Sequence, residues 1–304
     1  MIGLGNMGKP MAHNLLQAHD HVTVYDANEA VTKEFKSTNA IIGESAQKAA
    51  AGADVVILML PNSQVVEKVV LGEQGISQEM KKGSLIIDMS TSAPSSTKII
   101  AEEVENNGLY FLDAPVSGGV KKAVSGELTI MVGGDESQYE RSLNVLEPMG
   151  KEIFHVGKVS SGHTMKALNN LLSAAHFLAT SEVLVAGNKA GLEPEKMLEV
   201  INASTGRNHS SETKFPNFVL NREFNSGFSM DLITKDIELA LEITKEFKTP
   251  AFLSSTVYEV WRLANKLSEG KYDHTEMAKF CENWGDVTLN YTEEEKITHE
   301  KRNS

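Results

Sequence analysis

Several features that define a site or a compartment are scarce in this sequence. The 304 residues include a single cysteine, Cys281, so no internal disulfide can form, and no Cys/His group has the spacing of zinc ligands. The longest clearly apolar run, Val55–Leu60, is far shorter than the roughly 18 residues of a membrane span, and no signal segment opens the chain. We therefore expect no metal site and no membrane contact. The expected location is the cytoplasm in a bacterium, or the mitochondrial matrix in a eukaryote after removal of a targeting segment, and the protein is not expected to be secreted.

Positive charge is also scarce. The chain has 29 Lys and Arg against 41 Asp and Glu, a formal net charge of −12. That balance repels a phosphate backbone and argues against nucleic acid as a partner. The hydrophobic fraction of 41% and the charged fraction of 23% are typical of folded globular proteins. A chain of this length is expected to form two domains, or one large one.

The first half of the chain alternates short β-branched runs with helical segments. This rhythm is typical of parallel β-α-β units, and the all-apolar run Val55–Leu60 suits a central strand with helices on both faces. The predicted strands are Val22–Tyr25, Val55–Leu60, Leu85–Asp88, Tyr110–Leu112, Leu128–Val132 and Ile153–Val156.

The second half carries only helical periodicity. Its predicted helices are Thr164–Lys189, Pro194–Ala203, Ser229–Lys245, Ser254–Leu267 and Thr275–Trp284. We therefore predict an α/β Rossmann-type domain with a parallel sheet over residues 1–160, followed by an all-α domain over residues 161–291. The polar stretch 292–304 is predicted to be a solvated tail.

A glycine cluster near the start predicts dinucleotide binding. Gly3, Gly5 and Gly8, with Asn6 and Met7 between the last two, match G-x-G-x-x-G and lead into a predicted helix. Glycines there permit a tight turn and a close approach of backbone N–H groups to a pyrophosphate.

Asp26 follows the run Val22–Tyr25, where this fold places an acid on the adenosine ribose hydroxyls. A carboxylate repels a 2′-phosphate and no arginine follows it, so NAD is the expected cofactor. A glycine turn beside a solvated Asp is the alternative.

The first strand is short. Only Met1 and Ile2 precede Gly3, whereas a central strand usually has about five residues. We expect either that the native chain has further residues upstream, which an intact mass would reveal, or that this strand is brief and weakens the domain.

Four motifs together resemble the β-hydroxyacid dehydrogenases. Besides the glycine cluster they are Asp113–Gly119, Gly162–Asn170 and Lys235–Ala240. The resemblance runs from Met1 to about Trp284 and implies a Rossmann-type domain, a helical domain and an active site in the cleft between them. It also implies oxidation of a primary alcohol at the β-position of a carboxylic acid, with hydride transfer to nicotinamide.

The segment Ser204–Ser211 is most similar to family members that act on 3-hydroxyisobutyrate. This implies conversion of 3-hydroxyisobutyrate to methylmalonate semialdehyde, a step of valine breakdown. Tartronate semialdehyde reduction, another β-hydroxyacid dehydrogenase activity and a non-catalytic NAD-binding scaffold remain alternatives. The partners expected are a small hydroxy acid and further copies of the chain, as a homodimer or homotetramer.

The resemblance implies that Lys166 is the catalytic acid/base. To accept a proton near neutral pH, its ammonium form must be disfavoured by burial and by the nicotinamide cation. Gly162, Lys166 and Asn170 are spaced i, i+4 and i+8, so they share one helix face, with the glycine expected to leave room for substrate or cofactor. Asn170 is expected to hold the substrate against Lys166. An exposed helix lysine is the competing interpretation.

Other positions are implied to bind substrate or cofactor. Ser117, Gly118 and Gly119 offer a hydroxyl and approachable amides for the substrate carboxylate, although an ordinary turn looks similar. Arg207 could pair with the same carboxylate, or form a loop or interface salt bridge. The positions that match NAD contacts are Leu60, Pro61, Thr91 and Lys235.

Overall fold

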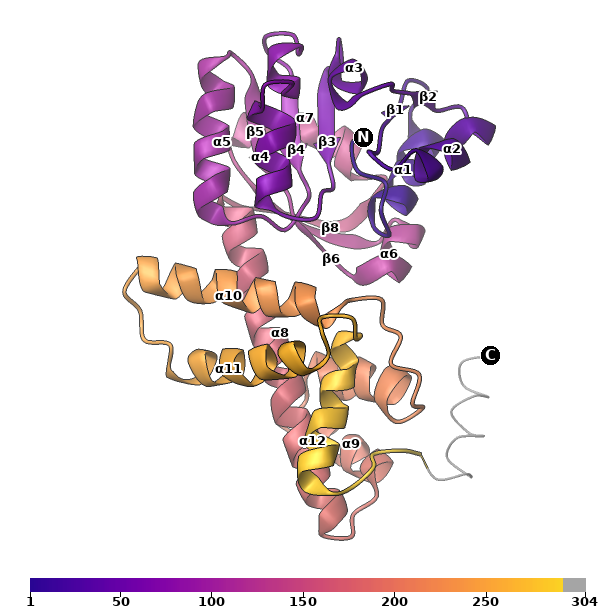
Figure 1. Ribbon diagram of the computed structural model, residues 1–304, viewed down its shortest axis with the longest axis vertical. Coiled ribbons are helices and arrows are strands. Elements are labelled where there is room, and N and C mark those ends of the chain that lie inside the picture. The colour runs from indigo at the N-terminus through magenta and orange to yellow at the C-terminus, as the bar shows by residue number, and fades with distance from the viewer. Residues whose placement is uncertain (292–304) are drawn as a thin grey trace. The chain divides into compact units, whose positions relative to one another are not determined.

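The computed structural model describes residues 1–291, which fold into two compact units (Figure 1). The first unit is Met1–Ala167 and the second begins at Leu168. The chain passes from one to the other inside a continuous helix, α8 (Ser161–Lys189). The stretch 292–304, predicted to be a solvated tail, lies outside the described residues. Within residues 1–291, every helix is too short or too polar to cross a lipid bilayer.

The first unit alternates strands and helices as the sequence predicts. Its strands are β1 (Thr23–Val24), β2 (Ile41–Ile42), β3 (Val55–Leu58), β4 (Leu85–Asp88), β5 (Tyr110–Asp113), β6 (Val116–Ser117), β7 (Leu128–Gly133) and β8 (Gly150–Gly157). Its helices are α1 (Gly8–Ala18), α2 (Glu29–Glu34), α3 (Ala46–Ala50), α4 (Ser63–Leu71), α5 (Pro94–Asn106), α6 (Gly119–Ser125) and α7 (Glu136–Leu146), with 3-10 turns η1 (Phe35–Ser37) and η2 (Ile76–Gln78).

The strand order is that of a doubly wound dinucleotide-binding sheet. β1 pairs with β2, and β3, β4 and β5 pair in parallel. Ile2 makes parallel bridges to Tyr25 at the end of β1 and to Leu58 at the end of β3. The sheet therefore reads β2, β1, Ile2, β3, β4, β5, and the order reverses beside Ile2, where such sheets bind ligands.

Alternate residues of the central strands pack into two separate cores. Ile57 and Ile87 pack with residues of α1 and α7, whereas Val56 and Ile86 pack with residues of α4 and α5. Strands covered on both faces have no polar face, which explains the uninterrupted apolar run of β3 in the sequence.

The sheet is mostly parallel, as predicted, with one strand, β7, running against its neighbours β5 and β6. β7 is antiparallel to both β5 and β6, and β8 is parallel to β7. The connection from β5 to β7 contains only β6 and the seven-residue helix α6, so the chain stays at the carboxyl edge of the sheet and enters β7 from there. Strands β2 and β6, of two residues each, were not predicted, because so short a run carries no periodicity.

The second unit is helical, as predicted. Besides the rest of α8 it contains α9 (Pro194–Asn202), the π-helix η3 (Ser210–Val219), α10 (Met230–Glu246), α11 (Phe252–Leu267), the 3-10 turn η4 (His274–Glu276) and α12 (Met277–Gly285). Pro194 stands in the first turn of α9, and the Ser229 side chain accepts from the Leu232 amide to cap α10. The sequence did not predict η3, which carries Pro216 within it.

Candidate functional site

The three glycines of the first loop serve different purposes. A Cβ on Gly3, whose φ is +93°, would lie 2.2 Å from the Met59 carbonyl oxygen, and a Cβ on Gly8 would lie 2.0 Å from the Gly3 carbonyl oxygen. These two glycines let the loop, β3 and α1 pack closely. A Cβ on Gly5 would meet nothing within 4 Å. Gly5 and Asn6 are exposed, and the loop continues directly into the N-terminus of α1. The free backbone N–H groups at such a helix start can bind a pyrophosphate.

Asp26 is half-buried and bonded to this loop. Its Oδ2 accepts from the Leu4 amide at 2.7 Å and its Oδ1 accepts from the Asn28 amide at 2.8 Å. Each carboxylate oxygen keeps a further lone pair for a hydroxyl group. The residues that follow, Ala27 to Glu29, are exposed and include no cation.

The predicted cofactor positions after β3 and β4 are joined by a hydrogen bond. The Leu60 amide donates to Ser90 Oγ at 2.9 Å, so the turn containing Leu60 and Pro61 is fixed to the loop that carries Ser90 and Thr91. Pro61 is exposed and Thr91 half-buried. Both loops lie at the carboxyl edge of the sheet.

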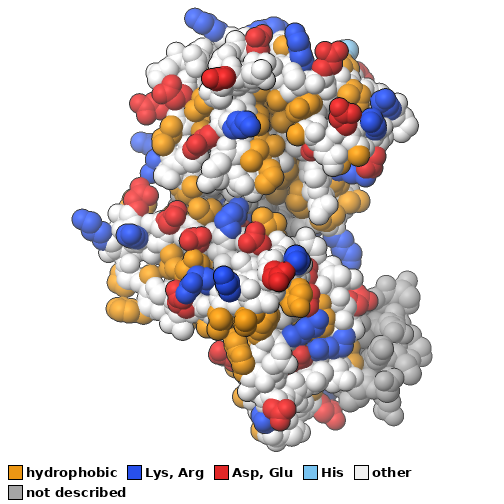
Figure 2. Space-filling model, viewed as in Figure 1, with side chains coloured by type: hydrophobic (Ala, Val, Ile, Leu, Met, Phe, Trp, Pro, Cys, Tyr) orange, Lys and Arg blue, Asp and Glu red, His pale blue; other side chains and the backbone are white. Residues whose placement is uncertain are grey.

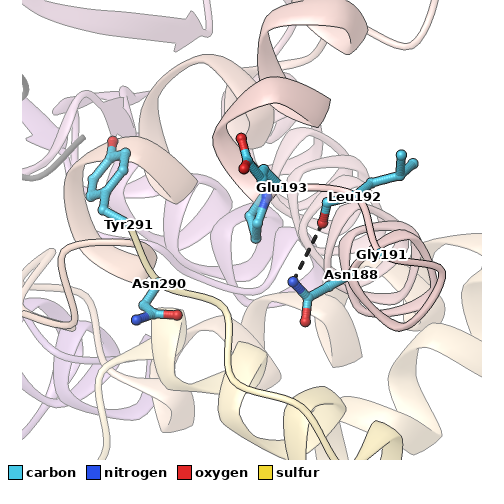
Figure 3. A pocket seen from close by; sticks show the side chains of 7 residues that line it. Asn188, Gly191, Leu192, Glu193, Asn290 and Tyr291 are labelled. Atoms are coloured by element: carbon cyan, nitrogen blue, oxygen red, sulfur yellow. Dashed lines mark hydrogen bonds between the residues drawn. The ribbon is translucent and has the colours of Figure 1, made fainter. Parts of the chain in front are cut away.

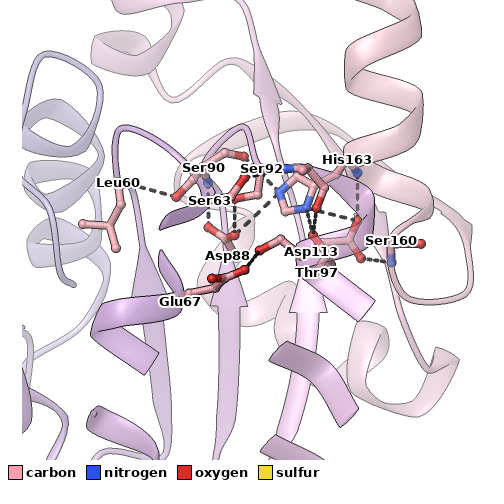
Figure 4. Close-up of polar contacts among 12 residues, drawn as sticks. Leu60, Ser63, Glu67, Asp88, Ser90, Ser92, Thr97, Asp113, Ser160 and His163 are labelled. Atoms are coloured by element: carbon pink, nitrogen blue, oxygen red, sulfur yellow. Dashed lines mark hydrogen bonds and ion pairs between the residues drawn. The ribbon is translucent and has the colours of Figure 1, made fainter. Parts of the chain in front are cut away.

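Below these loops lies a buried polar cluster that the sequence did not predict as part of the site (Figure 4). Asp88 and Asp113 are register partners at the ends of β4 and β5, and His163 of α8 lies between them, 3.8 Å from one oxygen of each. All three are fully buried. Burial raises the pKa of Asp113, while His163 and the backbone donors of His163 and Ser160 oppose that rise. In the sequence, this cluster could have been found from the acid that ends each of two buried strands, Asp88 in β4 and Asp113 in β5.

Lys166 lies one turn further along α8 and is only 9% exposed, so it is not the exposed helix lysine of the competing interpretation. Gly162, on the same face, has a different purpose from the one expected. A Cβ there would lie 2.3 Å from the Met131 carbonyl oxygen and 2.7 Å from that of Asp113. The glycine therefore makes room for the sheet backbone, and not for a ligand.

In the second unit, Asn170 and Lys235 are joined by an acid between them. Asn170 Nδ2 donates to Asp236 Oδ2 at 2.6 Å, and Lys235 Nζ lies 3.2 Å from Asp236 Oδ1. Asp236 is 2% exposed. The side chain of Asn169 donates to Asn170 Oδ1 at 3.3 Å. Asp236 thus holds two of the predicted functional residues in fixed positions.

The predicted carboxylate-binding residues differ in their surroundings. Gly118 and Gly119 have φ values of +134° and +69°, which other residues rarely adopt, and Ser117 before them is half-buried. Arg207 has a side chain that is 64% exposed and pairs with Glu212 at 3.3 Å. The loop salt bridge named as an alternative for Arg207 is therefore present.

Two hollows in the surface are lined by residues other than these. One of about 250 Å³ is lined by seven residues of the second unit, two of which, Asn188 and Leu192, are joined by a hydrogen bond from the Asn188 side chain to the Leu192 carbonyl oxygen (Figure 3). Among residues 1–291, no group of three or more His, Cys, Asp or Glu side chains could hold a metal ion. On the face shown in Figure 2, acidic and basic side chains are interspersed.

Comparison with known families divides the chain into two matching parts. Residues 1–157 match the NAD-binding domain of 6-phosphogluconate dehydrogenase, and residues 160–281 match the NAD-binding domain of NADP-dependent 3-hydroxyisobutyrate dehydrogenase. The chain belongs to the β-hydroxyacid dehydrogenase family. It is an NAD(P)-dependent oxidoreductase with an α/β cofactor-binding domain and a helical second domain, as the sequence motifs implied.

Relatives within this family act on different hydroxy acids. The chain is 40% identical to 2-(hydroxymethyl)glutarate dehydrogenase of Eubacterium barkeri, over 95% of this chain and 96% of that protein. It is 38% identical to the mitochondrial 3-hydroxyisobutyrate dehydrogenase of Mus musculus, over 92% and 85%. It is 36% identical to the NAD-dependent L-serine dehydrogenase of Pseudomonas aeruginosa, over 91% and 95%.

Solved structures agree with this assignment. The structure of Mycobacterium tuberculosis 3-hydroxyisobutyrate dehydrogenase with L-serine has a TM-score of 0.86 and 33% identity, covering 92% of this chain and 97% of that chain. The 3-hydroxyisobutyrate dehydrogenase from Salmonella typhimurium has a TM-score of 0.81 and 27% identity, covering 92% and 98%.

Proposed function

We propose that the protein oxidises 3-hydroxyisobutyrate to methylmalonate semialdehyde with NAD, as in valine breakdown, with Lys166 as the acid/base. The observation that carries the proposal is a lysine only 9% exposed, one turn before Asn170 on one helix. The substrates named for the relatives share a CH₂OH group on the carbon that bears the carboxylate. For each of these substrates the reaction needs one base for the hydroxyl proton and one group that binds the substrate carboxylate. The other substituent on the carbon beside that carboxylate does not change this requirement.

Each residue has a defined part in this chemistry. Lys166 Nζ accepts the hydroxyl proton of the alcohol, and returns it to the aldehyde oxygen in the reverse direction. Asn170, fixed by Asp236, donates its remaining amide hydrogen to the substrate and holds it against Lys166. A bound nicotinamide cofactor would supply the hydride acceptor for the CH₂OH carbon, the carbon whose hydroxyl proton goes to Lys166.

For the substrate carboxylate we propose an anchor at Ser117, Gly118 and Gly119. Gly118 and Gly119 are exposed and have successive positive φ values, they carry no side chain that would shield their amides, and the Ser117 hydroxyl precedes them. Arg207, paired with Glu212, is the second proposed contact. Unlike Arg207, the segment Ser117–Gly119 is neutral and adds no charge that would compete with proton transfer at Lys166.

The cofactor positions fit a nicotinamide dinucleotide. The open side of the loop at Gly5, with Asn6 and Met7 leading into α1, suits the pyrophosphate, and the half-buried Asp26 suits the ribose hydroxyls. The other proposed contacts are Gly3, Gly8, Leu60, Pro61, Thr91 and Lys235. A carboxylate with no neighbouring arginine favours NAD over NADP.

A second substrate is supported by Lys214. Its ammonium donates to Ser173 Oγ at 3.0 Å, and Ser173 lies three residues after Asn170 on α8, on the same side of the helix. A cation at this position suits a second carboxylate, which 2-(hydroxymethyl)glutarate carries and 3-hydroxyisobutyrate lacks. Tartronate semialdehyde reduction remains an alternative, as does a scaffold without catalysis.

The test measures NADH formation from NAD, and NADPH formation from NADP, with 3-hydroxyisobutyrate, 2-(hydroxymethyl)glutarate, L-serine and glycerate. We expect the highest kcat/KM with NAD and 3-hydroxyisobutyrate. Lys166→Ala should lower kcat at least 100-fold, the usual effect of losing an acid/base, with NAD affinity changed less than about threefold. Lys189→Ala, at the exposed end of α8, is the control. An unchanged kcat in Lys166→Ala would remove Lys166 from the mechanism.

Lys214→Met separates the two substrates. We expect kcat/KM to fall about tenfold for 2-(hydroxymethyl)glutarate and to change less than twofold for 3-hydroxyisobutyrate, because only the former has a carboxylate for this cation. Equal effects on both substrates would exclude Lys214 as a specificity residue.

We also propose a homodimer or homotetramer in the compartment of its eukaryotic relatives, or in the bacterial cytoplasm. Large apolar side chains reach the surface of the second unit around α10 and α11 (Figure 2). Phe252 and Leu253 are 87% and 71% exposed, which is costly in a monomer. Light scattering after size exclusion tests this: a single species of about 33 kDa would contradict it.

A further inference from the structure

His163 is the one ring in the buried cluster of the first unit, and both of its nitrogens have polar neighbours (Figure 4). Nε2 lies 3.1 Å from the Ser90 carbonyl oxygen, and Nδ1 lies 2.7 Å from the Thr97 hydroxyl. Since a carbonyl only accepts, Nε2 donates to Ser90, while Nδ1 is hydrogen-bonded to the Thr97 hydroxyl, which also lies 3.1 Å from the Ala93 carbonyl oxygen. The ring thereby bridges the loop after β4 and helix α5.

The backbone of His163 is held as firmly as its ring. Its amide donates to Asp113 Oδ2 at 2.8 Å, and the Ser160 amide donates to Asp113 Oδ1 at 2.7 Å. A carboxylate thus satisfies two amides at the start of α8, where a helix has no backbone acceptors of its own. Through His163, the first turn of α8 is therefore hydrogen-bonded to Asp113 at the end of β5 and to Ser90 in the loop after β4.

Close packing leaves this turn no alternative position. A Cβ on Gly133 would lie 2.8 Å from the Gly162 amide nitrogen, and a Cβ on Gly162 would overlap the backbone of β5 and β7. The helix start therefore rests backbone against backbone on the strand ends. Lys166 follows His163 by three residues, less than one helical turn. A displacement of His163 would therefore displace Lys166 as well.

The same ring is linked to the cofactor edge. Ser90, whose carbonyl accepts from His163, also accepts the Leu60 amide through its hydroxyl. Leu60 stands in the turn after β3 and Thr91 directly follows Ser90, and both are proposed cofactor contacts. A single imidazole therefore connects the helix of the proposed base with the loops proposed to hold the hydride acceptor.

We propose that His163 is a positioning residue for the dehydrogenase reaction: its two ring nitrogens fix the first turn of α8, and with it Lys166, against the loop after β4. The proposal rests on the proposed role of Lys166. His163 itself takes no proton from the substrate, because its ring is fully buried and both nitrogens are engaged within the cluster.

The test compares His163→Gln, whose amide can donate to the Ser90 carbonyl as Nε2 does, with His163→Leu, which cannot donate. We expect His163→Leu to lower kcat about 10- to 100-fold, the scale of a misplaced catalytic group, with the KM for NAD changed less than about threefold. His163→Gln should recover kcat to within about threefold of the original. The control is His274→Leu, which removes an equally buried histidine bonded to a backbone carbonyl in the second unit.

A role in stability alone predicts a different pattern. Both leucine variants would then melt at lower temperature, while kcat per folded molecule stayed unchanged. An unchanged kcat in His163→Leu, or equal losses in His163→Gln and His163→Leu, would overturn the proposal.

Hydrogen exchange gives a readout independent of activity. Amides 162–167 should exchange about tenfold faster in His163→Leu than in the original chain, and at the original rate in His163→Gln and His274→Leu. If Lys166→Ala retained activity while this pattern held, the role of Lys166 would fail and the anchoring by His163 would stand. Unchanged exchange in His163→Leu would refute the anchoring itself.

Discussion

The side-chain amide of Asn170 donates to the carboxylate of Asp236 at 2.6 Å, and the same carboxylate pairs with Lys235. Two residues predicted to contact substrate and cofactor are thus held by one buried acid. An amide bound on one side to a carboxylate has a fixed orientation, because only its oxygen can accept from Asn169 and only its nitrogen can donate to Asp236.

Replacing Asp236 should reduce turnover more than stability. In Asp236→Leu the Asn170 amide loses its acceptor and Lys235 loses its ion pair, so we expect kcat/KM for the alcohol to fall at least tenfold. Asp236→Asn keeps an acceptor for Asn170 and should lose less. Steady-state kinetics and thermal melting check both, with Glu238→Gln on the exposed face of α10 as the control. Equal kinetics in Asp236→Leu and the original chain would contradict the prediction.

Substitutions of two glycines in the first loop, Gly8 and Gly5, should affect different properties: the stability of the fold and the binding of NAD. Gly8→Ala places a Cβ 2.0 Å from the Gly3 carbonyl and should destabilise the protein by roughly 1–3 kcal/mol. Gly5→Ala meets no neighbouring atom, so we expect an unchanged melting temperature but weaker NAD binding, because the added methyl group stands where a phosphate would approach. Denaturant unfolding and NAD titration measure these effects. If Gly5→Ala bound NAD as tightly as the original chain, the proposed phosphate site at Gly5 would be wrong.

Asp26 should determine the choice of cofactor. Asp26→Asn keeps an acceptor for the Leu4 amide but removes the charge that repels a 2′-phosphate. We expect the ratio of kcat/KM for NAD to that for NADP to fall at least tenfold. Asp20→Asn, outside the loop, should leave the ratio unchanged. The same ratio in both variants would mean that Asp26 does not select the cofactor.

Acid should destabilise the second unit through Asp273. Burial by itself raises the pKa of Asp273, but hydrogen bonds from His274 and Thr275 outweigh it and hold the pKa well below its usual value. A carboxyl with a lowered folded pKa stabilises the fold above its unfolded pKa of about 3.9, and this stability is lost as pH falls further.

Asp273→Asn should therefore be less stable at pH 7 by about 1–3 kcal/mol and lose less stability than the original chain between about pH 5 and pH 2. Unfolding in urea at several pH values measures both effects. Asp135→Asn, at the exposed cap of α7, should leave the pH dependence as it was. Parallel pH curves for Asp273→Asn and the original chain would contradict the prediction.

Much of the fold follows from local patterns. The apolar run at β3 and the long period of α8 mark a buried strand and a long helix without knowledge of any partner. The reversal of β7 does not follow, because strand direction depends on how the chain returns across the sheet. The π-helix η3 was also not predicted, since Pro216 within it argues against a helix in the sequence.

The candidate site was only partly predictable for the same reason. Lys166 and Asn170 were named because the segment Gly162–Asn170 resembles the β-hydroxyacid dehydrogenases, and only their shared helix face followed from local spacing. The position of His163 could not be predicted, because its contacts with Asp88 and Asp113 join residues far apart in the chain.

By itself, the sequence determined the α/β and helical halves, the glycine loop with its acid at Asp26, and the candidate lysine on α8. These features depend on neighbours within one element or one turn. Only the tertiary structure decided that Asp236 holds Asn170, that Gly162 makes room for the sheet, and that His163 joins three elements. Such contacts exist only after strands and helices pack, because burial brings together polar groups that the chain order keeps apart.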